Sequence, residues 1–309
     1  MKRLSLKEQG SLLYTISAQH KPRLCVDPGE TFSVETEDAF SGQIRKDGDR
    51  RDLSSIPYGN PQCGPIYVNQ AHPGNILAIK LENIEPLMGQ GATRIVSSWY
   101  TSKYDTELSN KFLGAESTVP DGAKICKIAD GMIHFDRFKI PYAPMIGTLS
   151  TADPLESYLA WFPGPHGGNM DIPDIGIGAT VYLPVRVEGA LLHIGDAHAA
   201  QGEGELSGAA VEMPSLTTLT VDLIKNRPPI NWPRIETREH LFVVAATETG
   251  RSFEEAMQIG FLQLALWLEQ DFSIDKWVAF ELLSLVAKVR VGNFWTVAVG
   301  LPKKYLQKE

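Results

Sequence analysis

Hydrophobic and polar residues alternate in short segments over the first two thirds of the chain, and turn residues separate these segments. Pro28-Gly29, Pro73-Gly74 and Glu188-Gly189 each precede such a segment. A turn followed by residues of period two is typical of a β-strand. The strands predicted in this way cover Thr31–Thr36, Ile76–Leu81, Thr180–Val185 and Leu191–Ile194. We therefore predict a β-rich body, shaped like a sandwich or a barrel, with no helix-length amphipathic segment before about Met213.

The pattern changes after Pro214, where helical segments appear between strands. Strands are predicted at Thr217–Leu223 and Leu241–Ala246. Ser252, with Glu255 three residues later, forms a capping box that predicts a helix with apolar residues through Trp267. A second helix is predicted over about 274–284, and 286–299 returns to a β pattern. The expected fold is mainly β, with residues 1–214 as a β-rich body that carries the site motifs. Residues 215–309 form an α+β portion with two helices packed on that body.

Composition and charge narrow the class of protein. The 309 residues are 43% hydrophobic and 21% charged, which is ordinary for a globular protein that buries a sizeable core. The net charge of -8 argues against nucleic acid or an anionic membrane as a partner, because both require basic surfaces. No run of 18 apolar residues predicts a membrane span, and the first residues do not form a signal peptide. We expect a cytoplasmic protein.

The three cysteines, Cys25, Cys63 and Cys126, indicate neither a zinc ribbon nor a disulfide framework, because no Cys-x-x-Cys motif occurs. Cys25 lies in the apolar segment Leu24-Cys25-Val26, where a buried and unreactive thiol is expected. No activating neighbour points to a nucleophilic cysteine.

Two glycine-bracketed polar clusters hold most of the candidate chemistry. The first is Gly164–Asp171, and the second is Gly195–Glu205. Both combine imidazole with oxygen donors, and this mixture suits zinc, manganese or a similar divalent ion. Asp196 and His198 are two positions apart, so on an extended strand both side chains point to the same face. The alternative is a pair of solvated loops with no special role.

Other candidates are less specific. Glu35, Asp38 and Gln43 lie at the end of the first predicted strand, where a solvated strand end is the alternative interpretation. Trp99, Tyr100 and Trp161 could line a small pocket or simply pack against other side chains.

Several of these segments, taken together and in order, resemble the acetamidase/formamidase family. The resemblance is carried by Gly164–Asp171, Tyr182–Val185, Asp196–Gly202, Gly204-Glu205, Glu35–Phe40, Gly64–Val68 and Pro73-Gly74. Two positions depart from the family pattern: Glu188 replaces an expected proline, and Leu149–Asp153 is less apolar. The second departure lies near a possible substrate pocket and leaves the identity of the substrate open.

The resemblance implies an amidohydrolase that converts short-chain linear amides, such as formamide or acetamide, to the carboxylic acid and ammonia. It also implies a β-rich fold with an α+β portion, a divalent metal site, and a homodimer or higher homo-oligomer. The sequence contains no Gly-x-Ser-x-Gly elbow and no cysteine among acids, so metal-activated water is the expected nucleophile. Zinc is the expected ion, with calcium or manganese as alternatives.

Residue roles are carried over onto matching positions. Asp171, Asp196 and His198 are the expected metal ligands, and His166 and Asp38 are further candidates. Glu205 is the expected general base, and Asn169 the expected hydrogen-bond donor to the oxyanion. Supporting residues or alternative ligands are expected at Glu35, Gln201, Glu203 and Glu212. His193, in an apolar strand, is expected not to be a ligand.

Two other functions remain open at this point. One is a metal-dependent hydrolase acting on a different C–N bond, such as that of a carbamate or a cyclic amide. The other is a non-catalytic β module whose acids hold a calcium ion, because oxygen-rich loops also suit that ion. Imidazole in the clusters argues against a site for calcium alone.

Overall fold

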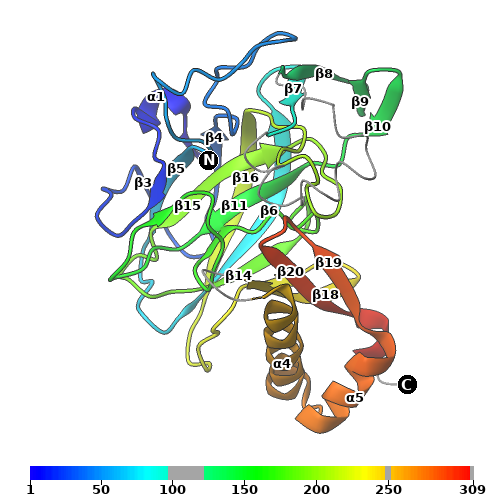
Figure 1. Ribbon diagram of the computed structural model, residues 1–309. Coiled ribbons are helices and arrows are strands. Elements are labelled where there is room, and N and C mark those ends of the chain that lie inside the picture. The colour runs from blue at the N-terminus through cyan, green and yellow to red at the C-terminus, as the bar shows by residue number, and fades with distance from the viewer. Residues whose placement is uncertain (97–121, 248–251, 307–309) are drawn as a thin grey trace.

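The computed structural model describes residues 1–96, 122–247 and 252–306, and within them most of the regular structure is β (Figure 1). A nine-stranded sheet has the order β1-β4-β16-β6-β14-β17-β18-β20-β19. Its strands are β1 (Lys2–Leu4), β4 (Thr31–Thr36), β6 (Ile76–Pro86), β14 (Thr180–Pro184), β16 (Ser215–Ile224), β17 (Arg234–Glu236), β18 (His240–Ala246), β19 (Lys288–Val291) and β20 (Thr296–Pro302). The sheet forms the spine of the molecule.

A five-stranded sheet with the order β13-β11-β15-β5-β3 packs on the first part of this spine. Its strands are β3 (Leu24–Val26), β5 (Gln62–Val68), β11 (Met145–Ser150), β13 (Gly167–Asn169) and β15 (Leu192–His198). Two small sheets are β10-β9-β8-β7 and β12-β2. They consist of β7 (Gln90–Thr93), β8 (Lys124–Ala129), β9 (Met132–Phe135), β10 (Phe138–Pro141), β2 (Thr15–Ile16) and β12 (Tyr158–Leu159).

One hydrophobic core joins the nine- and five-stranded sheets. It contains Val34 and Ile79 from the first sheet and Ile66 and Ile194 from the second, all fully buried. Both sheets are open, with free edge strands, so the body is sandwich-like and not a closed barrel. The prediction of a mainly β fold with an α+β C-terminal part is confirmed.

Two helices, α4 (Phe253–Phe272) and α5 (Lys276–Val286), cover the other part of the spine (Figure 1). A second core forms there, where Leu264 and Trp267 of α4 pack against Val243 and Val299 of the sheet. The predicted capping box is present, because Ser252 accepts a hydrogen bond from the Glu255 amide and the Glu255 side chain binds the Ser252 amide. Shorter helical segments are α1 (Leu6–Gln9) and the 3-10 helix η1 (Lys303–Leu306).

The division expected at residue 214 is not a break in the main sheet. Strand β16, which follows it, lies between β4 and β6 in the centre of that sheet. Cys25, expected to be buried, is exposed, whereas Cys63 and Cys126 are buried. The reason is that β3, which holds Cys25, is the edge strand of the five-stranded sheet.

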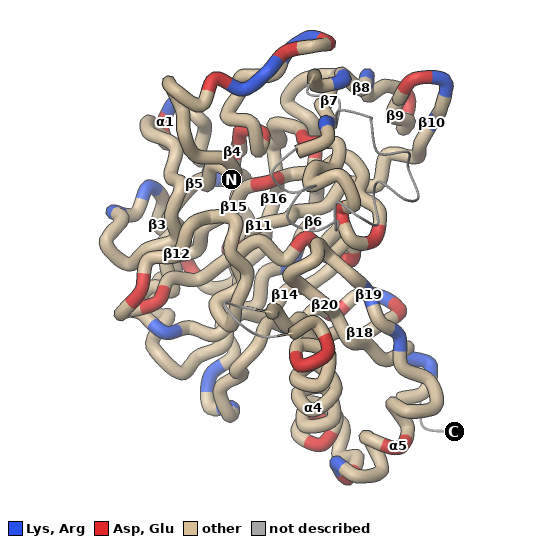
Figure 2. The backbone as a smooth tube through the Cα atoms, viewed as in Figure 1, with Lys and Arg blue, Asp and Glu red and all other residues tan. Residues whose placement is uncertain are grey.

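The charged side chains are spread along the chain. In the view of Figure 2, Lys and Arg occur on several segments and are interspersed with Asp and Glu. Within the described ranges, no helix combines the length and the apolar composition that crossing a membrane requires.

Candidate active site

Strand β11 brings the two glycine-bracketed clusters together. It lies between β13 and β15 in the five-stranded sheet. Strand β13 contains Gly167 and Gly168 of the first cluster, and β15 contains the first residues of the second cluster. Thr148 at the centre of β11 faces Asn169 on one side and Gly195 on the other. Residues about thirty positions apart are therefore adjacent because they flank the same strand.

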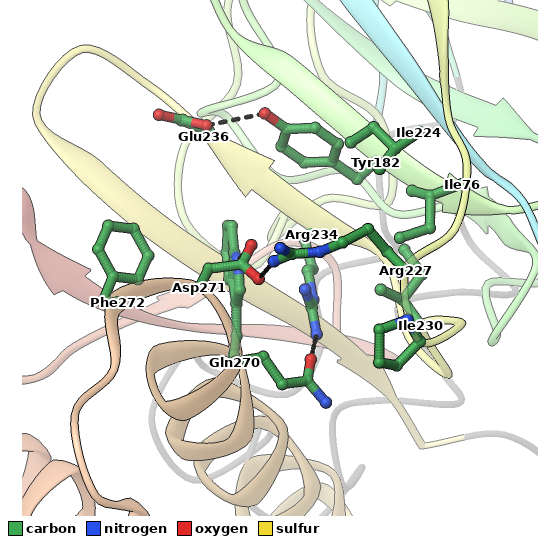
Figure 3. A pocket seen from close by; sticks show the side chains of 12 residues that line it. Ile76, Tyr182, Ile224, Arg227, Ile230, Arg234, Glu236, Gln270, Asp271 and Phe272 are labelled. Atoms are coloured by element: carbon green, nitrogen blue, oxygen red, sulfur yellow. Dashed lines mark hydrogen bonds and ion pairs between the residues drawn. The ribbon is translucent and has the colours of Figure 1, made fainter.

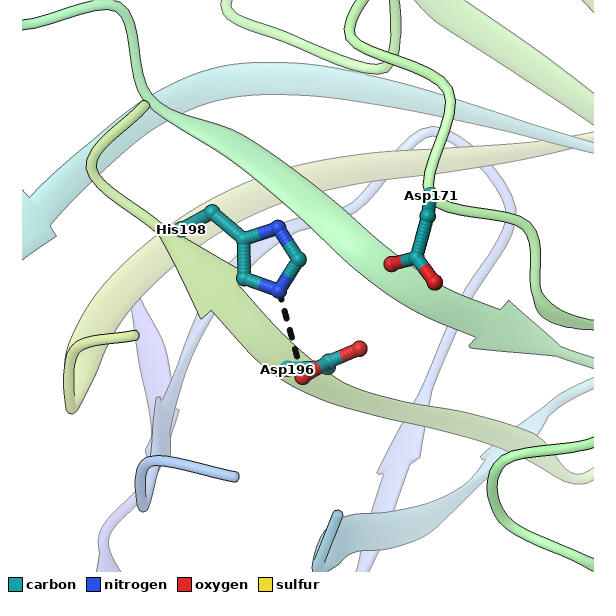
Figure 4. Close-up of side chains that lie close together, drawn as sticks. All are labelled: Asp171, Asp196 and His198. Carbon is teal, nitrogen blue, oxygen red and sulfur yellow. Dashed lines mark ion pairs between the residues drawn. The ribbon is translucent and has the colours of Figure 1, made fainter. Parts of the chain in front are cut away.

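Five ionisable side chains converge at the end of β15. Potential ligand atoms of Asp171, Asp196 and His198 lie within 4.8 Å of one another (Figure 4). A second group combines His198 with Glu205 and Glu212. His198 Nε2 lies 3.3 Å from Asp196 Oδ1 and 3.1 Å from Glu212 Oε2. Except for the half-buried Glu205, all of these residues are at most 4% exposed. The cluster is largely buried and predominantly acidic.

Gln201 fixes the tautomer of His198. Its Nε2 group donates to the carbonyl oxygens of Asp171, at 2.6 Å, and Gly292, at 2.9 Å. Its Oε1 is therefore the acceptor that faces His198 Nδ1 at 2.9 Å. With Nδ1 as donor, a neutral His198 keeps its Nε2 lone pair directed at the acids. That lone pair is available to a cation.

Amide and hydroxyl groups anchor one oxygen of each aspartate. Asp171 Oδ2 accepts hydrogen bonds from Asn169 Nδ2 and Asn293 Nδ2, both at 2.6 Å. Asp196 Oδ2 accepts from Asn60 Nδ2 at 3.2 Å and lies 3.3 Å from Thr148 Oγ1, whose one hydrogen has its shorter contact with Asn169 Oδ1 at 2.6 Å. The second oxygen of Asp171, Oδ1, is buried and has no hydrogen-bond partner, and Glu212 Oε2 faces only the Nε2 atom of His198. A buried acceptor such as Asp171 Oδ1 calls for a ligand that is not a protein donor.

The electrostatics favour a cation in the same place. Burial and the neighbouring Asp196 raise the pKa of Asp171 to about 8. Burial also raises the pKa of Glu205 and Glu212. Burial alone would lower the pKa of His198, but Glu212 and Asp196 outweigh it and raise that pKa well above its ordinary value. A positive ion among the acids would favour their ionised forms, so the four carboxylates and one imidazole of the two groups, with the unpartnered Asp171 Oδ1 among them, fit a divalent metal.

Gly147 of β11 provides the space for the two aspartates. A Cβ atom at this position would lie 2.3 Å from Asp171 Oδ1 and 2.5 Å from Asp196 Oδ2. Any side chain there would displace both carboxylates. A glycine inside an apolar strand often marks such a close approach, and this was the signal available in the sequence.

The sequence candidates divide clearly by position. The structure brings Asp171, Asp196, His198, Glu205 and Glu212 into the two groups, with Asn169 and Gln201 bonded to their members. Asn293, Asn60, Thr148 and Gly147 also belong to the centre, although sequence reasoning did not identify them.

Four other candidates have different partners. Asp38 pairs with Arg45 at 2.5 Å and caps its own turn by accepting from the Phe40 and Gly42 amides. Glu35 binds the Leu6 amide and Arg3, and Glu203 binds Arg290 and the Val291 amide. His166 stacks on Tyr158 with 3.9 Å between ring centroids. None of the four belongs to either group, because each local partner holds the side chain elsewhere.

The remaining histidine and aromatic candidates lie as follows. His193 is buried, with Nδ1 2.9 Å from the Leu191 carbonyl oxygen, and it belongs to neither group. Trp161 is 38% exposed. Trp99 and Tyr100 lie outside the described residues.

A comparison with known protein families shows to which of them this chain is related. The model of the Acetamidase/Formamidase family matches residues 19–162 and 160–260. The chain belongs to the acetamidase/formamidase family. Two curated relatives of this family member are an acetamidase of Mycolicibacterium smegmatis, 26% identical over 254 residues, and a formamidase of Methylophilus methylotrophus, 25% identical over 257 residues. The matched regions cover 65% of this chain but only 63% and 61% of those relatives, so it spans about three fifths of their length.

Solved structures match over nearly the full chain. An acetamidase from Yersinia enterocolitica is 36% identical with a TM-score of 0.87, covering 99% of this chain and 93% of its own. An acetamidase from Bacillus halodurans is 31% identical with a TM-score of 0.85, covering 98% of both chains. A γ-lactamase from Delftia acidovorans, at 18% identity and a TM-score of 0.59, shares the fold and covers 98% of this chain and 91% of its own.

Proposed function

We propose that this acetamidase/formamidase family member hydrolyses the C–N bond of short linear amides, such as formamide or acetamide. The products are a carboxylate and ammonia. The observation that carries the proposal is the buried cluster of Asp171, Asp196, His198 and Glu212, with an unpartnered oxygen on Asp171. The names of the relatives, acetamidase and formamidase, support the same substrate class.

We assign Asp171, Asp196 and His198 as metal ligands and add Glu212, which lies as close to His198 Nε2 as Asp196 does. Zinc suits this mixture of imidazole and carboxylate, with manganese or calcium as alternatives. When bound, such an ion would polarise the amide carbonyl and lower the pKa of water. The polar network described above holds the ligands in place.

Glu205 is the proposed proton carrier. It belongs to the group with His198 and Glu212, yet it is half-buried, so one side of it is open to water and substrate. Burial and the acidic neighbours raise its pKa, which suits a carboxylate that takes a proton from water and delivers it to the departing nitrogen. Water supplies one oxygen of the new carboxylate and the proton that converts the departing NH2 group into ammonia.

Asn169 has a restricted role in this scheme. One of its Nδ2 hydrogens is donated to Asp171, and its Oδ1 accepts hydrogen bonds from Asn60, at 2.9 Å, and Thr148, at 2.6 Å. A single N–H therefore remains to contact an oxyanion. The rigid network fixes the direction of that donor.

Ammonia release from a panel of amides tests the proposal. Wild-type protein should release ammonia from formamide or acetamide, lose this activity with a chelator, and recover it when a divalent metal is added. Asp196→Asn and His198→Ala should lose both metal and turnover. Glu203→Gln, a change of a nearby acid that pairs with Arg290, is the matched control and should retain both.

The same panel distinguishes the alternatives. If the protein hydrolyses a carbamate or a cyclic amide and does not hydrolyse linear amides, the proposed substrate class is wrong. Bound metal without turnover of any C–N substrate would reject an enzyme and favour a calcium-binding module. For Glu205→Gln we expect metal to be retained and turnover lost; turnover at the wild-type rate would remove Glu205 as the base.

We also propose that the protein is a cytoplasmic homodimer or higher homo-oligomer. The three unpaired cysteines support a reducing compartment. Exposed apolar side chains on α5, among them Trp277 at 68% and Leu285 at 80%, support a second copy as cover. Light scattering after size-exclusion chromatography should give a mass at least twice 34.0 kDa, and a monomer would refute the assembly.

A further inference from the structure

A cavity lies between the nine-stranded sheet and the C-terminal end of α4 (Figure 3). Its volume is about 260 Å³. This is slightly below the range of roughly 300–1,000 Å³ for pockets that hold drug-sized ligands, so it suits a small molecule. The cavity is lined by Ile76, Tyr182, Ile224, Arg227, Pro228, Ile230, Arg234, Glu236, Trp267, Gln270, Asp271 and Phe272. None of these residues belongs to the candidate active site.

Arg234 is the central polar group of this cavity. It is only 7% exposed, and its guanidinium lies over the Trp267 ring at 4.8 Å from the centroid. Its Nη2 group donates to Gln270 Oε1 at 3.2 Å. Burial lowers the pKa of Arg234 to about 10, so the group is still charged at neutral pH.

The two acids of the cavity are bound by other groups. Asp271 pairs with Arg227 and accepts a hydrogen bond from Trp267 Nε1 at 2.9 Å. Glu236 accepts hydrogen bonds from Tyr182 at 2.8 Å and from Lys303 Nζ at 2.6 Å. Within the described ranges, Arg234 has no carboxylate at ion-pair distance, although Asp271 attracts it through space. Arg227, Arg234 and Lys303 together exceed Asp271 and Glu236 by one positive charge. A buried charge without a counter-ion is costly, and an anion would relieve that cost.

The walls determine which kind of anion fits. Ile76, Ile224, Ile230 and Phe272 present apolar surface, and Trp267 supplies an aromatic wall. A guanidinium matches a carboxylate geometrically, and apolar walls favour a hydrocarbon tail over a hydrated inorganic ion. One excess positive charge is balanced by a monoanion and would be exceeded by a phosphate dianion.

We propose that this cavity binds a small organic monocarboxylate, with its carboxylate on Arg234 and its aliphatic tail against the isoleucines and Trp267. The site is independent of the proposed amidase centre, since the two share no residue.

Titration calorimetry with sodium hexanoate tests this site. Wild-type protein should bind one hexanoate per chain in a saturable manner, and hexan-1-ol and inorganic phosphate should not bind. Arg234→Gln should weaken hexanoate binding at least tenfold. Arg137→Gln is the matched control, because Arg137 also lies over an aromatic ring, Phe138, but at an exposed site; it should bind as the wild type does.

A second variant leaves the stacked arginine in place. In Gln270→Glu a carboxylate replaces the amide that already reaches Arg234, so it should compete with hexanoate and weaken binding at least tenfold. Gln258→Glu adds the same charge to an exposed position of the same helix and should leave binding unchanged. The comparison of Gln270→Glu with Gln258→Glu tests the carboxylate site even if Arg234→Gln does not fold.

Three results would overturn the proposal: no saturable binding of hexanoate to the wild type, equal binding of phosphate, or unchanged binding in Gln270→Glu. Hexanoate binding should persist in Asp196→Asn, which separates this cavity from product binding at the metal centre. Binding lost in Asp196→Asn and retained in Gln270→Glu would place hexanoate at that centre and also reject the inference.

Discussion

Replacing His166 with phenylalanine is expected to make the protein less sensitive to acid without removing its metal. His166 is 1% exposed, stacks on Tyr158, and has no hydrogen-bond partner at either ring nitrogen. Burial, assisted by the charge of Arg186, lowers its pKa to about 3. The folded protein therefore holds this imidazole neutral under conditions in which the unfolded chain protonates it.

The size of the effect on the free energy of unfolding follows from the difference between the pKa of His166 in the unfolded and in the folded chain. A histidine with a pKa of about 6.5 when unfolded and about 3 when folded stabilises the folded state fully above pH 6.5. That contribution is lost as the pH falls toward 3, at about 1.4 kcal/mol per pH unit. Between pH 7.5 and pH 5.0 the loss amounts to about 2 kcal/mol.

Urea unfolding of wild type and His166→Phe at these two pH values measures the effect. Phenylalanine keeps a stacked ring, and its different size adds a packing cost that does not depend on pH. The free energy of unfolding of the wild type should fall about 2 kcal/mol further than that of the variant. His134→Phe, at a half-exposed position of β9, is the control for loss of a histidine and should follow the wild type.

Two results would refute this reasoning. Parallel loss of stability in wild type and His166→Phe would show that His166 is not held neutral by the fold. Loss of bound metal in the variant, measured by elemental analysis, would restore His166 as a ligand.

Three further predictions concern other positions. Gly147→Ala should abolish metal binding, because its methyl group would overlap the carboxylates of Asp171 and Asp196; wild-type metal content by elemental analysis would be incompatible with the site described here. Asn293→Ala removes a donor to Asp171 and should weaken metal affinity about 10–100-fold in a competition assay with a chelating dye, an effect that an unchanged affinity would disprove. Ser252→Ala removes the N-cap of α4 and should lower the free energy of unfolding by about 0.5–2 kcal/mol with amide turnover unchanged; equal stability would mean that the cap contributes nothing.

Local signals in the sequence predicted their own structures well. The capping box at Ser252 spans four residues, so its hydrogen bonds do not depend on the rest of the fold. Strand β4 has the predicted limits, Thr31–Thr36, because its turn and its alternation are both local. Helix α5 begins at Lys276, two residues later than predicted, because Asp275 caps it by accepting from the Trp277 and Val278 amides.

Sequence motifs predicted only part of the candidate site, because some of its residues are brought in by long-range pairing. The glycine-bracketed motifs pointed to Asp171, Asp196 and His198, and strand pairing through β11 places them together. Glu212 was expected as a supporting residue or an alternative ligand, and an isolated bridge between His198 and Glu212 brings it directly to the imidazole. Nothing local to Val291-Gly292-Asn293 distinguishes it from an ordinary hairpin turn.

Asp38 shows the opposite case. It was a candidate ligand because it follows a strand in a motif shared with the family, but its carboxylate is used by its own turn and by Arg45, seven residues later. Short-range hydrogen bonds of this kind compete with any distant partner for an aspartate side chain. A sequence pattern alone does not show whether an aspartate binds its local partners or a distant one.

The bond from Asn293 to Asp171 has a consequence for how the protein is made. The two residues are 122 positions apart, so a ribosome must add all of the intervening chain before this donor exists. Until then Asp171 lacks one of its two amide donors and the carbonyl of Gly292 cannot hold Gln201. In a nascent chain the carboxylate of Asp171 therefore gains its second amide donor only after the hairpin of β19 and β20 has been synthesised, late in translation.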